Sequence, residues 1–231
     1  MRRISLVLIV FILLGCGILL NIAYAVSPGM EVAVLSEEEK ATFVNKVGLQ
    51  ITQTPNSQTS IRCFDARWDG SFALGSGSGE NCMVCVYDPY GVFEYGYRFT
   101  SEGNYGILLQ DDSIGIYFLR GSIILYYDHQ GVCIDAQKLK SSEQSNLQIK
   151  DFLNRTVLEI GDKTYVLERD FDIGDSYSRL VVIDDYGHRT VLYDVTANHR
   201  TEQFLLAVVP ISFFIAVVAL CIKKQKVKEG E

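Results

Sequence analysis

The stretch that decides the fold is Val86–Phe93, with the sequence VYDPYGVF. An apolar pair leads into Asp-x-x-Gly, and a second apolar pair leads out of it. The Asp88 side chain can accept hydrogen bonds from backbone amides two residues on, and Gly91 can take a positive φ. The stretch therefore predicts the tip of a hairpin between two β-strands.

The same pattern occurs twice more along the chain. Tyr126–Cys133 reads YYDHQGVC and Val182–Arg189 reads VIDDYGHR, at offsets of 40 and 56 residues from the first and second copies. The first offset matches the period of a β-propeller blade. The second fits if residues 138–152, where the sequence turns polar, are an insertion. Three related β units are therefore expected.

Two further strand candidates precede each copy, rich in Val, Ile, Tyr and Phe and bounded by turn residues. They are Cys63–Trp68 and Phe72–Gly75, then Gly106–Gln110 and Gly115–Leu119, then Thr156–Ile160 and Lys163–Glu168. The predicted fold class is mostly β, with three blade-like antiparallel units. Three units are too few for a closed ring of about four to eight blades. The domain is then an incomplete or irregular propeller-like stack, a different β arrangement, or one part of an oligomer.

A short helix is expected before the first β unit. Ser36 followed by Glu39 is a capping-box pattern, and apolar residues recur at helical spacing from Ala41 onward. The pattern predicts a helix over Glu37–Val47, ended by Gly48. The following segment, Gln50–Ser60, is expected to be extended or a loop.

Two uncharged apolar runs flank the β units. Ile4–Ala25 has 22 residues and Phe204–Ile222 has 19. As helices at about 1.5 Å per residue, each matches the roughly 30 Å hydrocarbon thickness of a bilayer. Two transmembrane helices flanking the β domain are therefore predicted.

Basic residues set the expected orientation. Arg2 and Arg3 precede the first run, and four lysines follow the second within 223–231. Positive residues near the ends of spans stay cytoplasmic. Both termini are therefore expected on the cytoplasmic side of the cell membrane, and the main domain on the other side. Two alternatives stay open: cleavage of a signal peptide after Ala25, and lipidation of Cys16.

The predicted division is 1–25 as transmembrane helix or signal peptide, 26–60 as linker with a short helix, 61–202 as the extracytoplasmic β-repeat domain, 203–222 as the second transmembrane helix and 223–231 as a basic tail.

The charge of the chain restricts its partners. The formal net charge is −7, and without the two terminal basic flanks 15 basic residues face 26 acidic ones in the outer part. Such an acidic domain disfavours nucleic acid and anionic surfaces. The expected partners are the lipid bilayer, for the two runs, and a protein or envelope component, for the domain.

Four cysteines fall in the outer part: Cys63, Cys82, Cys85 and Cys133. Buried thiols, one disulfide and a metal site are all compatible with an extracytoplasmic location. Residues three apart on a strand face opposite sides, so Cys82 and Cys85 could not easily grip one metal.

No motif for a reaction occurs in the sequence, and no catalytic, cofactor-binding or metal-binding residue is assigned. The three histidines, His129, His188 and His199, would need to converge with carboxylates to act as acid, base or ligand. The acidic turns lack the spaced ligands of a calcium loop.

The sequence therefore favours a non-enzymatic binding module, because tyrosines are abundant and enriched at recognition surfaces. An extracytoplasmic enzyme, hydrolytic by default, and an accessory subunit of a membrane complex are the alternatives. The candidate surface residues are Tyr90, Tyr95, Tyr97, Tyr127, His129 and His188.

The order of motifs resembles that of one bacterial group. The segments Ile61–Asp65, Gly70–Gly75, Val86–Asp88, Tyr95–Phe99 and Ile116–Gly121 carry the similarity, which covers about residues 61–195. The chain resembles membrane-anchored proteins of low-GC Gram-positive bacteria that have propeller-like repeats beside apolar anchors. That group has no assigned activity, so the resemblance implies fold and topology only.

Overall fold

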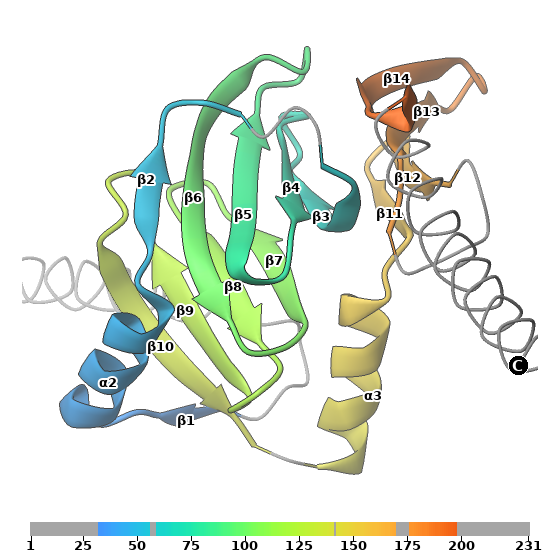
Figure 1. Cartoon of the computed structure of the whole chain (residues 1–231). Helices are drawn as coiled ribbons and strands as arrows, with labels where there is room; N and C mark the ends of the chain where they lie inside the picture. Colours follow the sequence, from blue (N-terminus) through green and yellow to red (C-terminus); the bar gives the residue numbers. More distant parts are fainter. Residues whose placement is uncertain (1–31, 56–58, 141, 170–175, 198–231) are drawn as a thin grey trace, which may run out of the picture.

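The computed structural model describes residues 32–55, 59–140, 142–169 and 176–197, which form three antiparallel sheets and two helices (Figure 1). Sheet B has the order β2 (Gln50–Thr52), β6 (Phe93–Ser101), β5 (Gly79–Tyr87), β4 (Phe72–Ser76), β3 (Ile61–Ala66). Sheet A has the order β1 (Val32–Val34), β10 (Cys133–Leu139), β9 (Ile123–Tyr127), β8 (Ile114–Phe118), β7 (Tyr105–Leu109). Sheet C has the order β11 (Val157–Ile160), β12 (Lys163–Glu168), β13 (Arg179–Asp184), β14 (Arg189–Asp194).

The prediction of a mostly β domain with three antiparallel units is confirmed. Each unit is a meander of four consecutive strands: β3 to β6, β7 to β10 and β11 to β14. Each predicted Asp-x-x-Gly tip joins the third strand of its meander to the fourth. All six earlier strand candidates also lie on strands, within two residues of the predicted ends.

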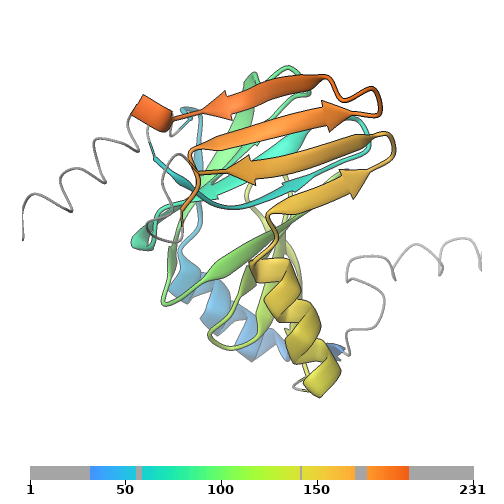
Figure 2. The same ribbon diagram turned by 90° about the vertical axis from the view of Figure 1, so that its right-hand side faces the viewer.

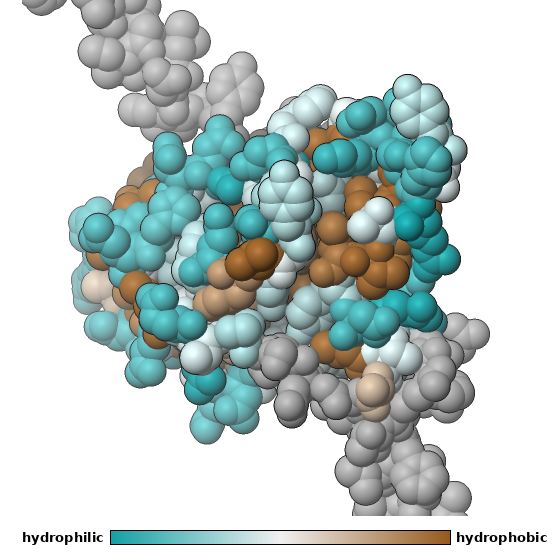
Figure 3. Space-filling model, turned by 90° about the horizontal axis from the view of Figure 1, so that it is seen from above, coloured by the Kyte–Doolittle hydropathy of each residue, from teal (hydrophilic) through white to brown (hydrophobic). Residues whose placement is uncertain are grey.

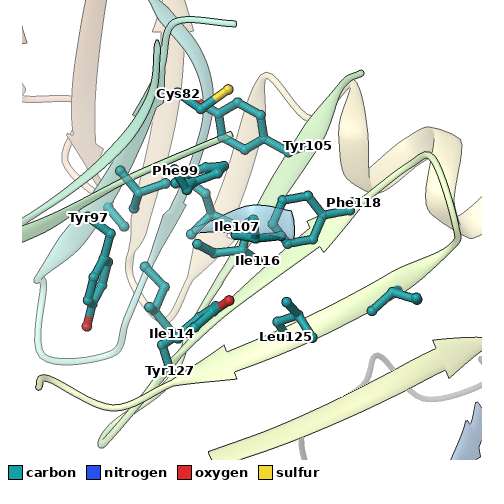
Figure 4. Close-up of a cluster of buried hydrophobic side chains, with 14 of the residues drawn as sticks. Cys82, Tyr97, Phe99, Tyr105, Ile107, Ile114, Ile116, Phe118, Leu125 and Tyr127 are labelled. Carbon is teal, nitrogen blue, oxygen red and sulfur yellow. The ribbon is translucent and has the colours of Figure 1, made fainter. Parts of the chain in front are cut away.

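The three sheets stack face to face, and the first unit, sheet B, lies in the middle. One face of sheet B packs on sheet A through a cluster that includes Val84, Tyr97, Ile107 and Ile116 (Figure 4). The other face packs on sheet C, where Phe72, Met83 and Tyr87 meet Tyr165, Leu167 and Leu180. Figure 2 faces sheet C, with sheet B behind it. Full burial of one such large apolar side chain stabilises the fold by about 1.5–3 kcal/mol.

The segment before the first meander fastens sheets A and B together. Its β1 pairs with β10 and its β2 pairs with β6, so it covers the outer strand of both sheets. Between them lies α2 (Glu37–Val47), as predicted, with the Ser36 and Glu39 capping box and a left-handed Gly48. Phe43, Val44 and Val47 of this helix pack against the core between the two sheets.

The polar insertion between the second and third units contains the second helix, α3 (Glu143–Leu153). Its Ile149, Phe152 and Leu153 pack on Tyr117, Ile124 and Tyr126 of sheet A. The face of sheet A that points away from sheet B is therefore covered (Figures 1 and 2).

The predicted transmembrane helices and basic tail lie outside the described residues, as do residues 26–31 and 56–58 of the predicted linker. In the part of the chain that the structure describes, neither helix is long and apolar enough to cross a bilayer.

Candidate functional site

The first repeat tip is built around the Asp88 carboxylate. One oxygen of this carboxylate accepts the backbone N–H of Tyr90 at 2.9 Å and that of Val92 at 2.8 Å. Gly91 has a φ of 81°, which a side chain would strain. The predicted mechanism of the turn is confirmed.

The other two tips repeat this arrangement. The Asp128 carboxylate accepts the N–H groups of Gln130 and Val132 at 2.9 and 2.8 Å. The Asp184 carboxylate accepts those of Tyr186 and His188 at 3.0 and 2.8 Å. The three Asp side chains therefore serve the turns, and the sequence repeat corresponds to a repeated structural unit.

The third position of each tip points away from the turn and can be varied without loss of the hydrogen bonds. It is Tyr90 in the first tip and Tyr186 in the third, and these side chains are 88% and 87% exposed. Trp68, in the turn between β3 and β4, is 82% exposed. Sequence reasoning did not single out Trp68 or Tyr186. The signals were an isolated Trp before Asp-Gly, and the match of Tyr186 to Tyr90 within the repeat.

The turns that carry these rings lie next to one another. A Cβ placed on Gly70, in the turn of Trp68, would lie 3.1 Å from Pro89, the neighbour of Tyr90. A Cβ on Gly161, between β11 and β12, would lie 2.8 Å from the Trp68 ring. Lys163 of that same hairpin lies opposite Asp184 in the register of β12 and β13, and Asp184 begins the turn of Tyr186. We call the three turns that carry Trp68, Tyr90 and Tyr186 the aromatic turns.

Figure 3 looks down on the end of the molecule where β5 and β6 join. Hydrophilic residues cover most of this face, and an apolar patch shows on its right-hand side, where sheet C lies. Exposed Val92 and Val191 add apolar surface on the first tip and on β14. The chain thus exposes aromatic and apolar groups together on the turns of two adjacent sheets.

Four of the predicted surface residues form a different group. Tyr95 contacts Tyr97 and His129 edge-on, with ring centroids 5.6 and 4.8 Å apart, and Tyr97 lies 6.3 Å from Tyr127. The Tyr97 hydroxyl donates to the Asp128 carbonyl at 2.7 Å, which ties β6 to the second tip.

Burial separates the members of this group. Tyr97 and Tyr127 are fully buried, so they pack the core between sheets A and B and offer no ring to a partner. Tyr95 is half-buried, and burial raises its pKa to about 12. His129 is exposed. Of these four, only His129 and the edge of Tyr95 remain available at the surface.

The two described histidines are not brought together. His129 lies on a tip of sheet A and His188 on a tip of sheet C, with sheet B between them. Sheets pack about 10 Å apart, so two layers separate these rings by roughly 20 Å. His188 Nδ1 instead pairs with Asp184 of its own turn at 3.0 Å. His199 lies outside the described residues.

The cysteines of the first unit are buried thiols, one of the three interpretations left open. Cys63 and Cys82 face the core shared with sheet A, whereas Cys85 faces the core shared with sheet C. Cys133 is half-buried. Within the described residues, no three His, Cys, Asp or Glu side chains are placed to hold a metal ion.

No protein-family model matches the chain, and no curated protein matches it.

Proposed function

We propose that this chain is a membrane-anchored binding module, held outside the cytoplasm, which recognises a protein or envelope component through its aromatic turns. The observation that carries the proposal is the exposure of Trp68, Tyr90 and Tyr186 on neighbouring turns. Large aromatic side chains are costly to leave in water and are enriched among the residues that dominate binding energy.

The repeat supports this assignment. The Asp-x-x-Gly hydrogen bonds fix the turn backbone whatever residue stands at its third position. An aromatic ring is therefore not required there by the fold, and Gln130 fills the same place in the second tip. A rigid turn presents its ring with little entropy left to lose on binding.

The apolar runs at 4–25 and 204–222 are the proposed anchors. The described domain begins in sheet A and ends in sheet C, the two outer sheets of the stack. The chain therefore approaches the two runs from opposite outer layers, which leaves the central sheet B and the turns between β3, β4, β5 and β6 free of direct attachment.

The enzyme alternative rested on convergence of His129 and His188. Their positions on sheets A and C, with sheet B between them, weigh against a shared catalytic cleft, because proton transfer needs a reach of about 3 Å. No observation among the described residues favours the alternative of an accessory subunit over a binding module.

A photo-crosslinking amino acid in the full chain, in its native membrane, tests the proposal. It is placed at Tyr90, at Tyr186 and, as a control, at Leu147, which is 60% exposed on α3. We expect the same crosslinked partner from positions 90 and 186 and no such adduct from position 147. The adducts at positions 90 and 186 should be lost when Trp68→Ala is added. Equal adducts at all three positions, or none at any, would contradict the proposed surface.

A reporter at each terminus tests the location separately. We expect both ends to be shielded from the medium and an impermeant maleimide to label Tyr90→Cys, in a background that carries Cys133→Ser so that the half-buried native thiol does not react. Reporters that are reachable at both ends, with a shielded residue 90, would overturn the topology.

A further inference from the structure

Exposed aspartates lie around the aromatic turns. Asp69 follows Trp68 in its own turn, and Asp185 precedes Tyr186 in the third tip. Asp162 lies in the hairpin between β11 and β12 that packs against the Trp68 ring. All three aspartates are exposed. The exposed rings of the aromatic turns are therefore accompanied by carboxylates.

The neighbouring turn of sheet A adds further negative charge. This turn, between β7 and β8, lies beside the turn of Trp68. The two turns are joined by Arg67 Nη1, which donates to the carbonyls of Gln110 and Asp111 at 3.0 and 2.8 Å. Asp111 and Asp112 are both exposed. Exposed carboxylates thus stand on adjacent turns of all three sheets.

Two basic residues among the described residues of these turns offset only part of this charge. Arg67 is held by the two carbonyls and by an ion pair with Asp69 at 3.3 Å, and its side chain is only 15% exposed. Lys163 is half-buried, and its Nζ would lie 3.6 Å from a Cβ placed on Gly70. Neither cation projects freely into solvent, so the surface around the rings is acidic.

Aromatic rings and carboxylates attract the same kind of group. The face of an aromatic ring attracts a cation through its quadrupole, and a carboxylate pairs with an ammonium or guanidinium group. From this combination we infer that the aromatic turns bind a lysine- or arginine-bearing segment of a protein. The inference rests on the proposed function and names the chemistry of its partner. The excess of 26 acidic over 15 basic residues in the outer part favours the approach of such a segment.

The spread of the carboxylates favours an extended segment over a single small cation. The turns that carry them belong to sheets A, B and C, with sheet B in the middle. Stacked sheets lie about 10 Å apart, so the outer turns are separated by roughly 20 Å. An extended chain rises about 3.3 Å per residue, so about six residues cover this span.

Trp68 is the only tryptophan of the chain, so tryptophan fluorescence reports on this surface alone. The test titrates the full chain, in a nonionic detergent, with a synthetic peptide of alternating glycine and lysine. The same peptide with acetylated lysines is the uncharged comparison, and a trisaccharide of N-acetylglucosamine represents a neutral glycan. We expect a saturable change with the lysine peptide alone. Its affinity should fall as the salt concentration rises, because exposed charges are screened.

The double variant Asp162→Asn with Asp185→Asn tests the carboxylates. The third tip is held by the Asp184 carboxylate, so this variant keeps the hydrogen bonds of that turn. We expect the lysine peptide to bind about fivefold more weakly, as the loss of two exposed charge pairs predicts. The matched control is Glu80→Gln, an exposed acid at the opposite end of β5, which should stay within about twofold of the wild type.

Weaker binding in the double variant, with the control unchanged, supports the inference. No binding of the lysine peptide by the wild type, equal affinities for the two peptides, or equal binding by the double variant and the control would each overturn it. A response to the trisaccharide alone would overturn it in favour of a glycan. The two proposals fail separately, because a crosslinked partner at positions 90 and 186 without a response to the lysine peptide would keep the binding module and remove its cationic partner.

Discussion

Asp65 and Arg155 lie 90 positions apart in the chain, and their side chains form an ion pair with an oxygen–nitrogen distance of 3.0 Å. The second Asp65 oxygen accepts the backbone N–H of Leu109 at 2.8 Å. Asp65 belongs to sheet B, Leu109 ends β7 of sheet A, and Arg155 precedes β11 of sheet C. One buried carboxylate therefore links all three sheets.

Removal of this carboxylate is expected to destabilise the whole domain. Asp65→Ala leaves the Leu109 N–H without its acceptor and Arg155 without its counter-ion, which should lower the free energy of unfolding by about 3 kcal/mol. Urea unfolding of the full chain in detergent, followed by the near-ultraviolet dichroism of the buried tyrosines, measures this. Asp112→Ala, an exposed aspartate in the turn after β7, is the control and should cost less than about 0.5 kcal/mol. Similar costs for the two variants would show that Asp65 does not join the sheets.

The pKa of Asp65 predicts how stability changes with pH. Burial raises this pKa from 3.8 to about 6, despite the opposing effects of the Leu109 N–H and Arg155. The folded state thus holds the proton more tightly than the unfolded chain, so the stabilisation that comes from this tighter proton binding is fully present below about pH 3.8 and is lost as the pH rises through about 6. The loss amounts to roughly 3 kcal/mol at most.

The comparison that isolates this effect is between wild type and Asp65→Asn, unfolded by urea at pH 4.5 and at pH 7.5. The free energy of unfolding of the wild type, relative to that of the variant, should be lower at pH 7.5 than at pH 4.5. A relative stability that rises with pH would mean that the folded protein favours the charged form.

Gly91 and Gly187 allow the cost of backbone strain to be measured separately from the cost of a steric clash between two sheets. Gly91 and Gly187 have φ values of 81° and 79° in equivalent turns, so alanine strains both by about 1 kcal/mol. A Cβ on Gly91 would lie 2.9 Å from the Leu192 carbonyl oxygen of β14, whereas a Cβ on Gly187 would have nothing within 4 Å. We expect Gly91→Ala to cost about 1–2 kcal/mol more than Gly187→Ala in urea unfolding. Equal costs would show that the first tip does not press on sheet C.

The thiols should differ in reactivity according to burial. Burial raises the pKa of Cys63, Cys82 and Cys133 alike, so the difference lies in access: Cys63, Cys82 and Cys85 are buried within the stacked sheets, whereas Cys133 is only half-buried. Half-buried Cys133 should therefore react first with a maleimide under native conditions, while the other three react only after unfolding. Mass spectrometry of labelled peptides distinguishes them, with a sample in guanidinium as the fully labelled control. Rapid native labelling of Cys63 would contradict its position in the core.

The sequence predicted the features that depend on short-range chemistry. The Asp88, Asp128 and Asp184 turns, and the helix capped by Ser36, are each held by hydrogen bonds within four residues. Such turns and caps form wherever their residues occur, so their residue types at fixed spacing were sufficient.

The stacking order was not predicted, because it depends on which faces are covered. All five residues of β4 are buried, whereas β14 has none that is fully buried. Burial on both faces does not identify the central sheet, because β8 and β9 of sheet A are also buried at every residue, with α3 packed on the outer face of that sheet. The pairing of β1 with β10, and the cover of sheet A by α3, have no local pattern either.

The candidate sites divide in the same way. Tyr90 could be found from its place in a repeated turn, whereas Tyr97 and Tyr127 were expected at the surface and are buried, because an alternating strand shows which residues share a face but not which face is covered. The Arg62, Arg155 and Arg169 side chains are far apart in the sequence, and only the folded chain brings them to the lining of one small pocket at the starts of β3 and β7.

The pairing of Val32 with Leu139 sets an order on synthesis. The ribosome makes β1 first, yet its hydrogen-bonding partner β10 is the last strand of the second meander and emerges only when that meander is complete. Until then β1 lacks its hydrogen-bonding partner and sheet A lacks its outermost row of backbone bonds, whereas β2 can pair with β6 of sheet B as soon as the first meander is made. A truncation that starts at residue 61 would leave that edge open permanently, which makes such a fragment prone to self-association.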